Sequence, residues 1–535
     1  MRFVSAPRLL LLLPLLAAAS GLLESCASHH FFQPDARIGP GSTAPLPAAA
    51  DTVRAVAGRH YKEHWALHYL FWGRHYRRVW AAPVTAPVLK LASAVPGGLR
   101  AGKAGGGFQS ISMTLEGATE RVYSLRALDK EPQKTLPKVL RHTFVLDLVR
   151  DATSAALPYA ALTVPPLAQA AGVAHGRPRL VYVRQDETGL GDMSERFQGK
   201  LALLEEKYET PASRTPDIAQ AKDFVDSEGM LKQLYAQPTT SIDQQAFLRA
   251  RLLDVWLGDW DRHEGQWNWA AFPQPGGRIR YQGIPKDRDQ VYFRFDDGLV
   301  PWLASRPFAA SKFHTFKPKY GYMPGLIKQA RFIDQRGLSQ LTRADFQRTA
   351  AELQRRLPDT LIERAIRRLP PAVFALEGPY LTAALRTRRD ALPQAADAYY
   401  LCWTREPQVG GTAQAERFVV RRYADSTVVK IFSAALGRAS GDSLRFQRTY
   451  FPKETHLLTL EGLGGDDVFD VTTTGSGRLM PLRIYGGAGT DRLQLQGSRR
   501  GLKLFDAPTE LVAAGGPGTK QPKKKRKAYD LTTDN

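Results

Sequence analysis

Two short acidic segments carry the residue types that phosphoryl-transfer chemistry requires. Gly258–His263 reads Gly-Asp-Trp-Asp-Arg-His, and Lys286–Gln290 reads Lys-Asp-Arg-Asp-Gln. Transfer of a phosphoryl group needs a carboxylate beside the acceptor hydroxyl, carboxylates on a divalent metal, and cations on the phosphates. We therefore expect Asp261 to act as the base. Asp287 or Asp289 is the expected ligand of Mg²⁺ or Mn²⁺, which prefer oxygen donors.

Further candidate residues flank these acids. Gln266 could complete the metal shell through its amide, and Arg262 and His263 complete the catalytic segment. The phosphate-binding candidates lie upstream, in a glycine turn and the strand after it: Gly105, Gly106, Gly107, Arg126 and Lys130. Backbone N–H groups of such a turn can cover phosphates, and cationic side chains can pair with them. The alternative is a structural role, in which a buried Asp261–Arg262 pair braces a core among the surrounding tryptophans.

The acidic segments resemble those of atypical kinase-like families: the spore-coat kinase CotH, the secretory-pathway casein kinases and the HipA-type kinases. In those families an Asp-Arg-His-like loop follows a helix, and a metal-binding aspartate comes at the end of the next strand. The matching strings are Asp261-Arg262-His263 and Ile284–Asp289. The resemblance implies a two-lobed kinase-like α+β domain that uses a nucleotide with Mg²⁺ or Mn²⁺.

One departure from the kinase pattern leaves a second interpretation open. Arg126 stands where kinases usually place their nucleotide-binding lysine. An arginine can hold phosphate bidentately, but the change is also compatible with a catalytically inactive binding or assembly module. A metallophosphoesterase is disfavoured, because Gly258–Arg262 is one residue short of that family's string and its partner motifs are absent. The whole chain also resembles a segment found beside phosphoesterase domains in surface proteins of Bacteroidota.

The elements that position these segments can be predicted from periodicity. Apolar residues at helical spacing predict a buried helix before the first acidic segment: Leu248, Leu252, Val255 and Trp256. Ser241 and Gln244 form a capping-box pattern at its start, and Gly258 is placed to end it. A hairpin with strands 108–115 and 121–128 is expected to carry the phosphate-binding residues.

A second constellation lies near the C-terminus. Gly486–Leu493 and, less closely, Gly462–Val468 resemble the calcium-binding nonapeptides of haemolysin-type β-rolls. The resemblance implies Asp466 and Asp491 as Ca²⁺ ligands. Stacking in that fold needs tandem repeats every nine residues, whereas these copies are 25 positions apart (462 to 487). Two similar but separate β-turns are therefore the alternative.

Composition and the N-terminus predict where the protein acts. The formal net charge of +22 favours phosphorylated or other anionic ligands. Arg2 and Arg8 precede the apolar run 9–19, a pattern typical of an export signal, and Leu23–Cys26 resembles a lipoprotein cleavage box. We expect a protein of the periplasm, outer membrane or cell surface, lipid-anchored at Cys26. An outer-membrane partner is expected, with no nucleic acid and no membrane contact beyond the lipid.

The sequence divides into five segments. They are a signal peptide (1–26), a linker (27–55), the kinase-like α+β domain (56–395), a β-rich domain (396–510) and a disordered basic tail (511–535). Residues 60–80 are dense in aromatic and basic side chains. That composition fits a membrane-interface or nucleic-acid surface. The favoured interpretation is a helix packed on the main domain with its basic residues facing water.

Overall fold

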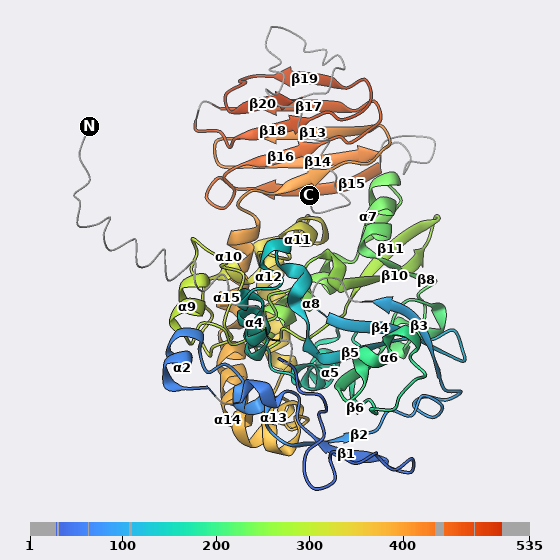
Figure 1. Cartoon of the computed structure of the whole chain (residues 1–535). Helices are drawn as coiled ribbons and strands as arrows, with labels where there is room; N and C mark the ends of the chain where they lie inside the picture. The colour runs from blue at the N-terminus through green and yellow to red at the C-terminus, as the bar shows by residue number, and fades with distance from the viewer. Residues whose placement is uncertain are drawn as a thin grey trace, which may run out of the picture.

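The computed structural model of the chain describes residue 28 and residues 31–62, 64–105, 110–433, 443–475 and 477–505 (Figure 1). Of the described residues, 34% are in helices and 26% in strands, and the strands form several sheets, which confirms the expected mixed α+β class. The signal segment with Cys26, the glycines Gly106 and Gly107, and the basic tail lie outside the described residues.

A five-stranded antiparallel sheet in the order β3-β4-β5-β7-β6 carries the cationic side of the candidate site. Its strands are β3 (Leu99–Gly105), β4 (Ser110–Gly117), β5 (Val122–Lys130), β6 (Arg179–Tyr182) and β7 (Leu201–Lys207). Alternation along β5 buries Tyr123, Leu125 and Ala127 in a core on one face of the sheet and leaves Arg126 for the other face. The predicted hairpin is thus confirmed as β4–β5.

A second, four-stranded sheet carries the acidic side of the site. Its order is β8 (Asp223–Asp226), β10 (Trp267–Gln274), β11 (Arg278–Pro285) and β9 (Thr240–Ile242), beside helix α8 (Gln244–Leu257). The predicted apolar helix is α8, and Gly258 ends it as expected. The predicted capping box is wrong: Ser241 lies in β9, and the N-cap is Asp243, whose carboxylate accepts the N–H of Ala246 at 2.9 Å.

Helix α8 is central to the main body. It packs against α5, α11, α12, α14 and α15 in one large apolar cluster. The helices of this body are α4 (Phe144–Asp151), α5 (Val164–Ala171), α6 (Ser194–Phe197), α7 (Ser227–Ala236), α9 (Leu299–Ala304), α10 (Met323–Leu326), α11 (Arg331–Gly337), α12 (Arg343–Arg356), α13 (Asp359–Ile366), α14 (Pro371–Asp390) and α15 (Leu392–Trp403). Dense packing on several sides holds the C-terminus of α8, and the acidic segment that follows it, in one position.

The C-terminal strands form a short solenoid at the top of Figure 1, in which parallel pairing joins the coils and two further strands of one sheet are added by antiparallel pairing. One sheet has the order β12-β16-β18-β20 and the other β15-β14-β13-β17-β19. The strands are β12 (Gln408–Gly410), β13 (Glu416–Arg422), β14 (Thr427–Ser433), β15 (Ser443–Tyr450), β16 (Leu458–Glu461), β17 (Val468–Thr473), β18 (Leu482–Tyr485), β19 (Arg492–Gln496) and β20 (Leu502–Phe505). Pairing of Leu458 with Leu482, and of Val468 with Arg492, stacks segments 24 residues apart.

The N-terminal part lies at the end of the molecule opposite the solenoid (Figure 1). It contains β1 (Thr52–Ala55), β2 (Val84–Pro87), α2 (Ala66–Trp72) and α3 (Arg77–Trp80). We expected a helix in residues 60–80 that turns its basic residues toward water. For α2 this expectation is wrong, because the exposed side chains at this helix, with 42–67% exposure, are apolar: Trp65, Leu67, Leu70 and Phe71. Within the described part of the chain, we find no helix with the length and hydropathy needed to cross a bilayer.

Candidate functional site

The loop after α8 presents Asp261 with an uncommitted carboxylate. Gly258 adopts a left-handed φ of 72°, so the chain turns sharply, and Asp259 N donates to Asp254 O at 2.9 Å. Asp261 is half-buried and makes no hydrogen bond or ion pair with any described residue. A carboxylate without a bound donor can accept a proton from a ligand placed beside it.

The β10–β11 hairpin brings the second acidic segment next to the first. Lys286 N donates to Gln266 O at 3.0 Å where the strand pair ends. Asp287 then adopts a left-handed φ of 57°, which is uncommon for a residue with a Cβ. Its Oδ2 lies 3.5 Å from Gln266 Nε2. The structure therefore places two of the expected metal-shell residues side by side.

Two cation–carboxylate pairs connect β5 to this hairpin. Arg126 Nη1 pairs with Asp287 Oδ1, and Lys130 Nζ pairs with Asp289 Oδ2; the four side chains are 11–21% exposed. Burial opposes the charge on the cations, but the two aspartates outweigh it and raise the pKa of both Arg126 and Lys130. Burial likewise opposes ionisation of Asp289, yet Lys130 and Arg126 lower its pKa. These pKa shifts favour the charged forms of Arg126, Lys130 and Asp289 at neutral pH.

Asp261 sits in the field of these charges. Burial raises the pKa of its carboxyl, and Asp289 and Asp287 raise it further, against the opposing influence of His263 and Lys130. A raised pKa makes a carboxylate a stronger proton acceptor. The Nδ1 of His263 accepts the N–H of Gly265 at 3.1 Å, so the contact that this histidine makes is local to its own turn.

Arg262, expected at the catalytic edge, is instead fully buried beneath it. Its Nε lies 3.3 Å from Asp254 Oδ2, and its Nη atoms donate to the carbonyls of Lys286 at 2.7 Å and Gln266 at 3.0 Å. These contacts join the loop after α8 to the β11 loop. Arg262 is therefore a positioning residue.

Asp254 is the residue that sequence reasoning missed. It is buried on α8 and forms ion pairs with Arg262 and Arg288. Arg288 also lies 3.1 Å from Asp259. A third guanidinium, that of Arg251, lies 2.6 Å away. Burial would raise the pKa of Asp254, but the three arginines lower it. An acid three residues after an arginine, inside an apolar helix, was the available signal.

The glycine turn and Arg126 are linked by strand pairing. Gly105 ends β3 opposite Ser112 of β4, and Ser112 lies opposite Arg126 of β5. The three residues thus form one row across the sheet. Gly106 and Gly107 lie outside the described residues.

A second candidate site lies at the corners of the solenoid. Three corners share a glycine followed five positions later by an acid: Gly411–Glu416, Gly462–Asp467 and Gly486–Asp491. Glu416 N donates to Asp467 Oδ1 at 2.8 Å, and Asp467 N donates to Asp491 Oδ1 at 3.0 Å. The two nonapeptide-like strings therefore stack, although they are not tandem repeats, because 24 residues complete one coil.

The stacked acids are buried without full compensation. Asp467 Oδ2 and Asp491 Oδ2 have no hydrogen-bond donor among the described residues. Burial raises the pKa of Asp467 to about 8, with Asp491 and Glu416 adding to the shift. Asp466, which we expected to bind metal, is exposed and accepts the N–H of Thr490 at 2.8 Å. The buried equivalent of Asp491 is thus Asp467.

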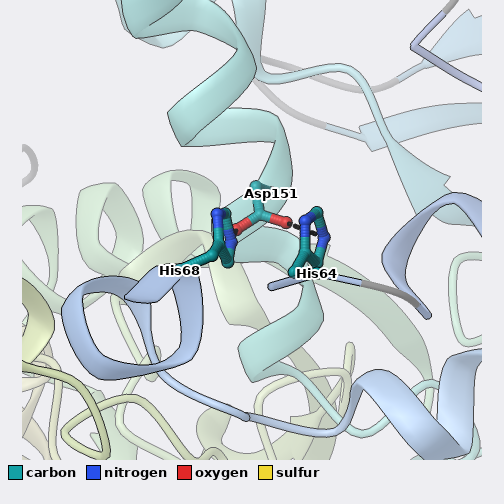
Figure 2. Close-up of side chains that lie close together, drawn as sticks. All are labelled: His64, His68 and Asp151. Carbon is teal, nitrogen blue, oxygen red and sulfur yellow. Dashed lines mark hydrogen bonds and ion pairs between the residues drawn. The ribbon is translucent and has the colours of Figure 1, made fainter. Parts of the chain in front are cut away.

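A third cluster consists of His64, His68 and Asp151, whose ligand atoms lie within 4.8 Å of one another (Figure 2). The imidazole rings are stacked, with centroids 3.9 Å apart and 12° between their planes. Nitrogen lone pairs lie in the ring planes, so nearly parallel rings do not point at one ion. Arg77 Nη2 also lies 2.6 Å from Asp151 and neutralises it. We interpret the cluster as the link between the α2 segment and α4.

Comparison with known proteins leaves the function to be argued from the site. No protein-family model matches the chain, and no curated protein matches it. The structure itself brings together, from three separate segments, residues that the sequence singled out: Arg126, Lys130, Asp261, Arg262, Gln266, Asp287 and Asp289. Asp466 and Asp491 belong to the separate solenoid.

Proposed function

We propose that this chain is an exported kinase-like protein that binds a nucleotide with Mg²⁺ or Mn²⁺ and transfers a phosphoryl group. The observation that carries the proposal is the set of two cation–carboxylate pairs, Arg126–Asp287 and Lys130–Asp289, beside Asp261. In the two-lobed arrangement that we propose, the sheet with β5 supplies the cations, and the α8 and β11 loops supply the acids.

Charge balance favours a ligand that carries both a metal and phosphates. In the protein alone, two aspartates and two cations neutralise each other. A divalent metal would take the carboxylates and phosphates would take Arg126 and Lys130, so that each charge keeps an opposite partner. A metal or an anion alone would leave one half of the set unpaired in a half-buried place, which is unfavourable.

The order of elements supports the kinase-like assignment. In protein kinases a glycine-rich loop covers the phosphates, and a cation on the third strand contacts them. Here Gly105 is the last residue of β3, and Arg126 lies on β5, the strand that follows β4. The additional acid near Arg126 is Glu205 on β7, whereas kinases use a glutamate on a helix.

The donor set fits a hard divalent cation. Asp287, Asp289 and Gln266 would hold it through oxygen atoms, which Mg²⁺ and Mn²⁺ prefer. When bound, the metal would neutralise charge on the phosphates. Asp261 would accept the proton of the acceptor hydroxyl, and Arg262 would keep the two loops in register.

Titration calorimetry of the full chain tests the charge argument. We expect binding of ATP with Mn²⁺ together, and little binding of either alone. Arg126→Met and Asp287→Asn should each abolish it. Arg121→Met is the matched control, because Arg121 pairs with Glu206 on the same sheet, outside the site. The proposal fails if no nucleotide–metal pair binds, or if Arg121→Met weakens binding as much as Arg126→Met.

A catalytically inactive binding module is the second candidate. The commitment of both expected metal-binding aspartates to cations favours it, as does arginine at position 126. Such a module would bind a phosphorylated or other anionic ligand, including one on an outer-membrane partner, without turnover. Phosphate transfer to any acceptor, lost in Asp261→Asn, would exclude this candidate; nucleotide binding that never leads to transfer would support it.

We also propose that Ca²⁺ stabilises the solenoid. A Cβ on Gly462 would collide with both Asp467 Oδ2 and the carbonyl oxygen of Gly486, so these oxygens converge within the corner. Calcium takes six to eight such oxygens. We expect Ca²⁺ to raise the melting temperature of the protein, and Asp491→Ala to remove the gain. An unchanged melt would exclude calcium there.

Export and lipid attachment at Cys26 are part of the proposal. They rest on the leader-like N-terminus and cleavage box. Metabolic labelling with a radioactive fatty acid should tag the protein in the membrane fraction, and Cys26→Ser should abolish the label. An equal label on the Cys26→Ser variant would rule out this attachment point.

A further inference from the structure

Two short helices expose apolar side chains next to each other. Helices α2 and α9 lie side by side in Figure 1 and are in contact. The side chains that we call the α2–α9 patch are all large, apolar and exposed: Trp65, Leu67, Leu70, Leu299, Trp302 and Leu303. Large contiguous apolar surfaces on a folded protein mark interaction sites.

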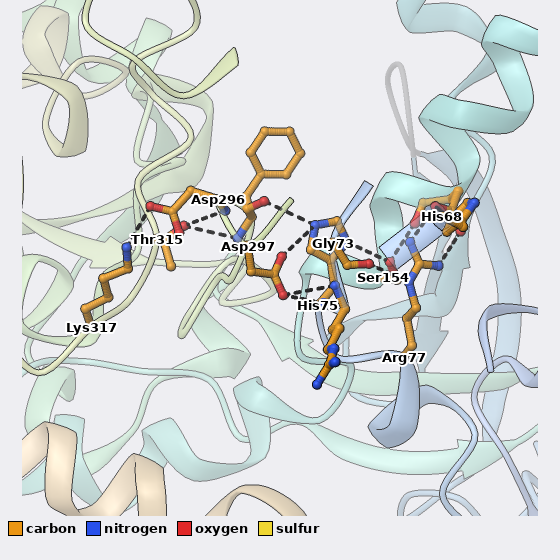
Figure 3. Close-up of polar contacts among 12 residues, drawn as sticks. His68, Gly73, His75, Arg77, Ser154, Asp296, Asp297, Thr315 and Lys317 are labelled. Atoms are coloured by element: carbon orange, nitrogen blue, oxygen red, sulfur yellow. Dashed lines mark hydrogen bonds and ion pairs between the residues drawn. The ribbon is translucent and has the colours of Figure 1, made fainter. Parts of the chain in front are cut away.

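Polar contacts join the segment after α2 to the segment before α9 (Figure 3). The Asp297 carboxylate, just before α9, accepts the backbone N–H of His75 at 2.7 Å and of Arg74 at 3.1 Å, just after α2. The buried ring of His75 lies 3.2 Å from Asp297 and 3.0 Å from Ser154 Oγ. Gly298 lies so close to Gly73 that a Cβ on it would collide with the Gly73 backbone. The two helices therefore present their apolar side chains as one fixed surface.

Basic residues outnumber acids around the patch. Residues 296–333 contain six Lys or Arg and two acids, Asp296 and Asp297, and residues 63–78 contain three Arg and one acid, Glu63. Asp296 lies 3.8 Å from Arg306 and 2.7 Å from Lys317, so part of this positive charge is balanced. The guanidinium of Arg306 lies 4.7 Å from the centre of the Trp302 ring. Tryptophan, leucine and basic side chains in one surface are the composition of membrane-interface segments. The positive charge favours anionic head groups.

Ser28, two residues after the expected lipid attachment point, is held on the helix that contacts α2. Ser28 N donates to Asp147 Oδ2 at 2.7 Å, which fixes residue 28 on α4. One helical turn later on α4, Asp151 lies 3.3 Å from His68 of α2. Cys26 is two residues before Ser28, so at most about 7 Å of extended chain separates them. An acyl chain on Cys26 would therefore enter a bilayer beside α2.

We propose that the α2–α9 patch lies on the surface of a bilayer that contains anionic phospholipid, with the apolar side chains inserted at head-group depth. This contact is a second attachment to the membrane, in addition to the lipid anchor, and it fixes the orientation of the protein on the membrane. The proposed orientation rests on the proposed acylation of Cys26. Binding of the patch to the membrane does not rest on acylation, because the side chains of the patch themselves supply the binding.

Vesicle flotation separates the patch from the anchor. The chain from residue 26, with Cys26→Ser so that no acyl chain contributes, should float with vesicles of phosphatidylglycerol and phosphatidylethanolamine, and less at high salt. Leu70→Gln with Leu303→Gln should lower the partition coefficient about tenfold or more, since two exposed leucines would no longer enter the bilayer. Leu444→Gln on the solenoid is the matched control, because Leu444 is 50% exposed and Leu303 51%.

Two results would overturn the proposal. The first is no flotation at any lipid composition, or equal flotation of the patch variant and the Leu444→Gln control. The second is a concentration-dependent dimer, seen by sedimentation equilibrium without lipid and lost in the patch variant, because the patch would then bind a second copy. Quenching of Trp65 and Trp302 fluorescence by brominated lipid, absent from Trp65→Phe/Trp302→Phe, would support insertion. None of these readouts depends on nucleotide or on acylation.

Discussion

Replacing Asp467 by asparagine should remove most of the pH dependence of the solenoid between pH 5 and 8. Asp467 is fully buried, and its Oδ1 accepts the N–H of Glu416 at 2.8 Å. Asparagine keeps that acceptor and the side-chain volume, but cannot ionise. The folded protein holds the Asp467 proton more tightly than the unfolded chain does. The stabilisation from this proton is complete below the ordinary pKa of aspartate and is lost as pH rises toward the folded value.

The magnitude follows from the two pKa values. The pKa of Asp467 is raised from 3.8 to about 8 by burial. Linkage then gives a loss of about 2 kcal/mol by pH 5 and about 5 kcal/mol by pH 8 from this group alone. About 3 kcal/mol of this stabilisation is therefore lost between pH 5 and pH 8. A bound Ca²⁺ would replace the proton, so it should stabilise the solenoid more at pH 8 than at pH 5.

Amide hydrogen exchange of peptides from residues 458–496, followed by mass spectrometry in EDTA, measures the local opening energy. We expect the wild-type protein to lose protection from pH 5 to pH 8, after correction for intrinsic exchange, and Asp467→Asn to lose little. Asp466→Asn is the control: its carboxylate is exposed and should leave the wild-type slope unchanged. Equal slopes for wild type and Asp467→Asn would refute the reasoning. A slope that Ca²⁺ leaves unchanged would refute only the calcium proposal.

Three further substitutions test the main domain. Asp261→Asn should lower the rate of phosphoryl transfer by about 10²–10⁴-fold in a radiometric assay, while calorimetry shows nucleotide–metal binding retained, because the base is needed only for the chemical step. Asp254→Asn leaves three buried arginines short of a counter-charge. It should therefore lower the free energy of unfolding, measured in urea, by about 3 kcal/mol or more. A loss under about 1 kcal/mol would contradict this role. Gly258→Ala should lower the free energy of unfolding by about 1–2 kcal/mol, because Gly258 has a left-handed backbone. The loss should exceed that of Gly276→Ala, because a Cβ at Gly258 would lie 2.9 Å from Phe316 Cδ2 whereas Gly276 has open space. Equal losses at the two glycines would refute the Phe316 contact.

Local patterns predicted the elements that hold the candidate site. The apolar spacing of α8 and the glycine at its end were correct, because helical periodicity and a left-handed C-cap are properties of a few consecutive residues. The start of α8 was misplaced from Asp243 to Ser241. Parallel pairing with β11 draws Ser241 into a strand, and that pairing partner lies about forty positions along the chain. The exposure of Trp65 and Leu70 was likewise missed, because periodicity does not say whether another element covers a face.

The sequence alone determined which side chains have the chemistry for a site: acids at 261, 287 and 289, cations at 126 and 130, and the glycine–acid strings of the solenoid. Only the tertiary structure decided how they are used. It paired Arg126 with Asp287 across two sheets and buried Arg262 against Asp254. It also showed that the acid stacked on Asp491 is Asp467 and not Asp466, which the sequence had predicted, because a coil of 24 residues fixes which side chain points inward. Residue type sets what a group can do, whereas burial and neighbours, which depend on contacts distant in the chain, set its charge and its partners.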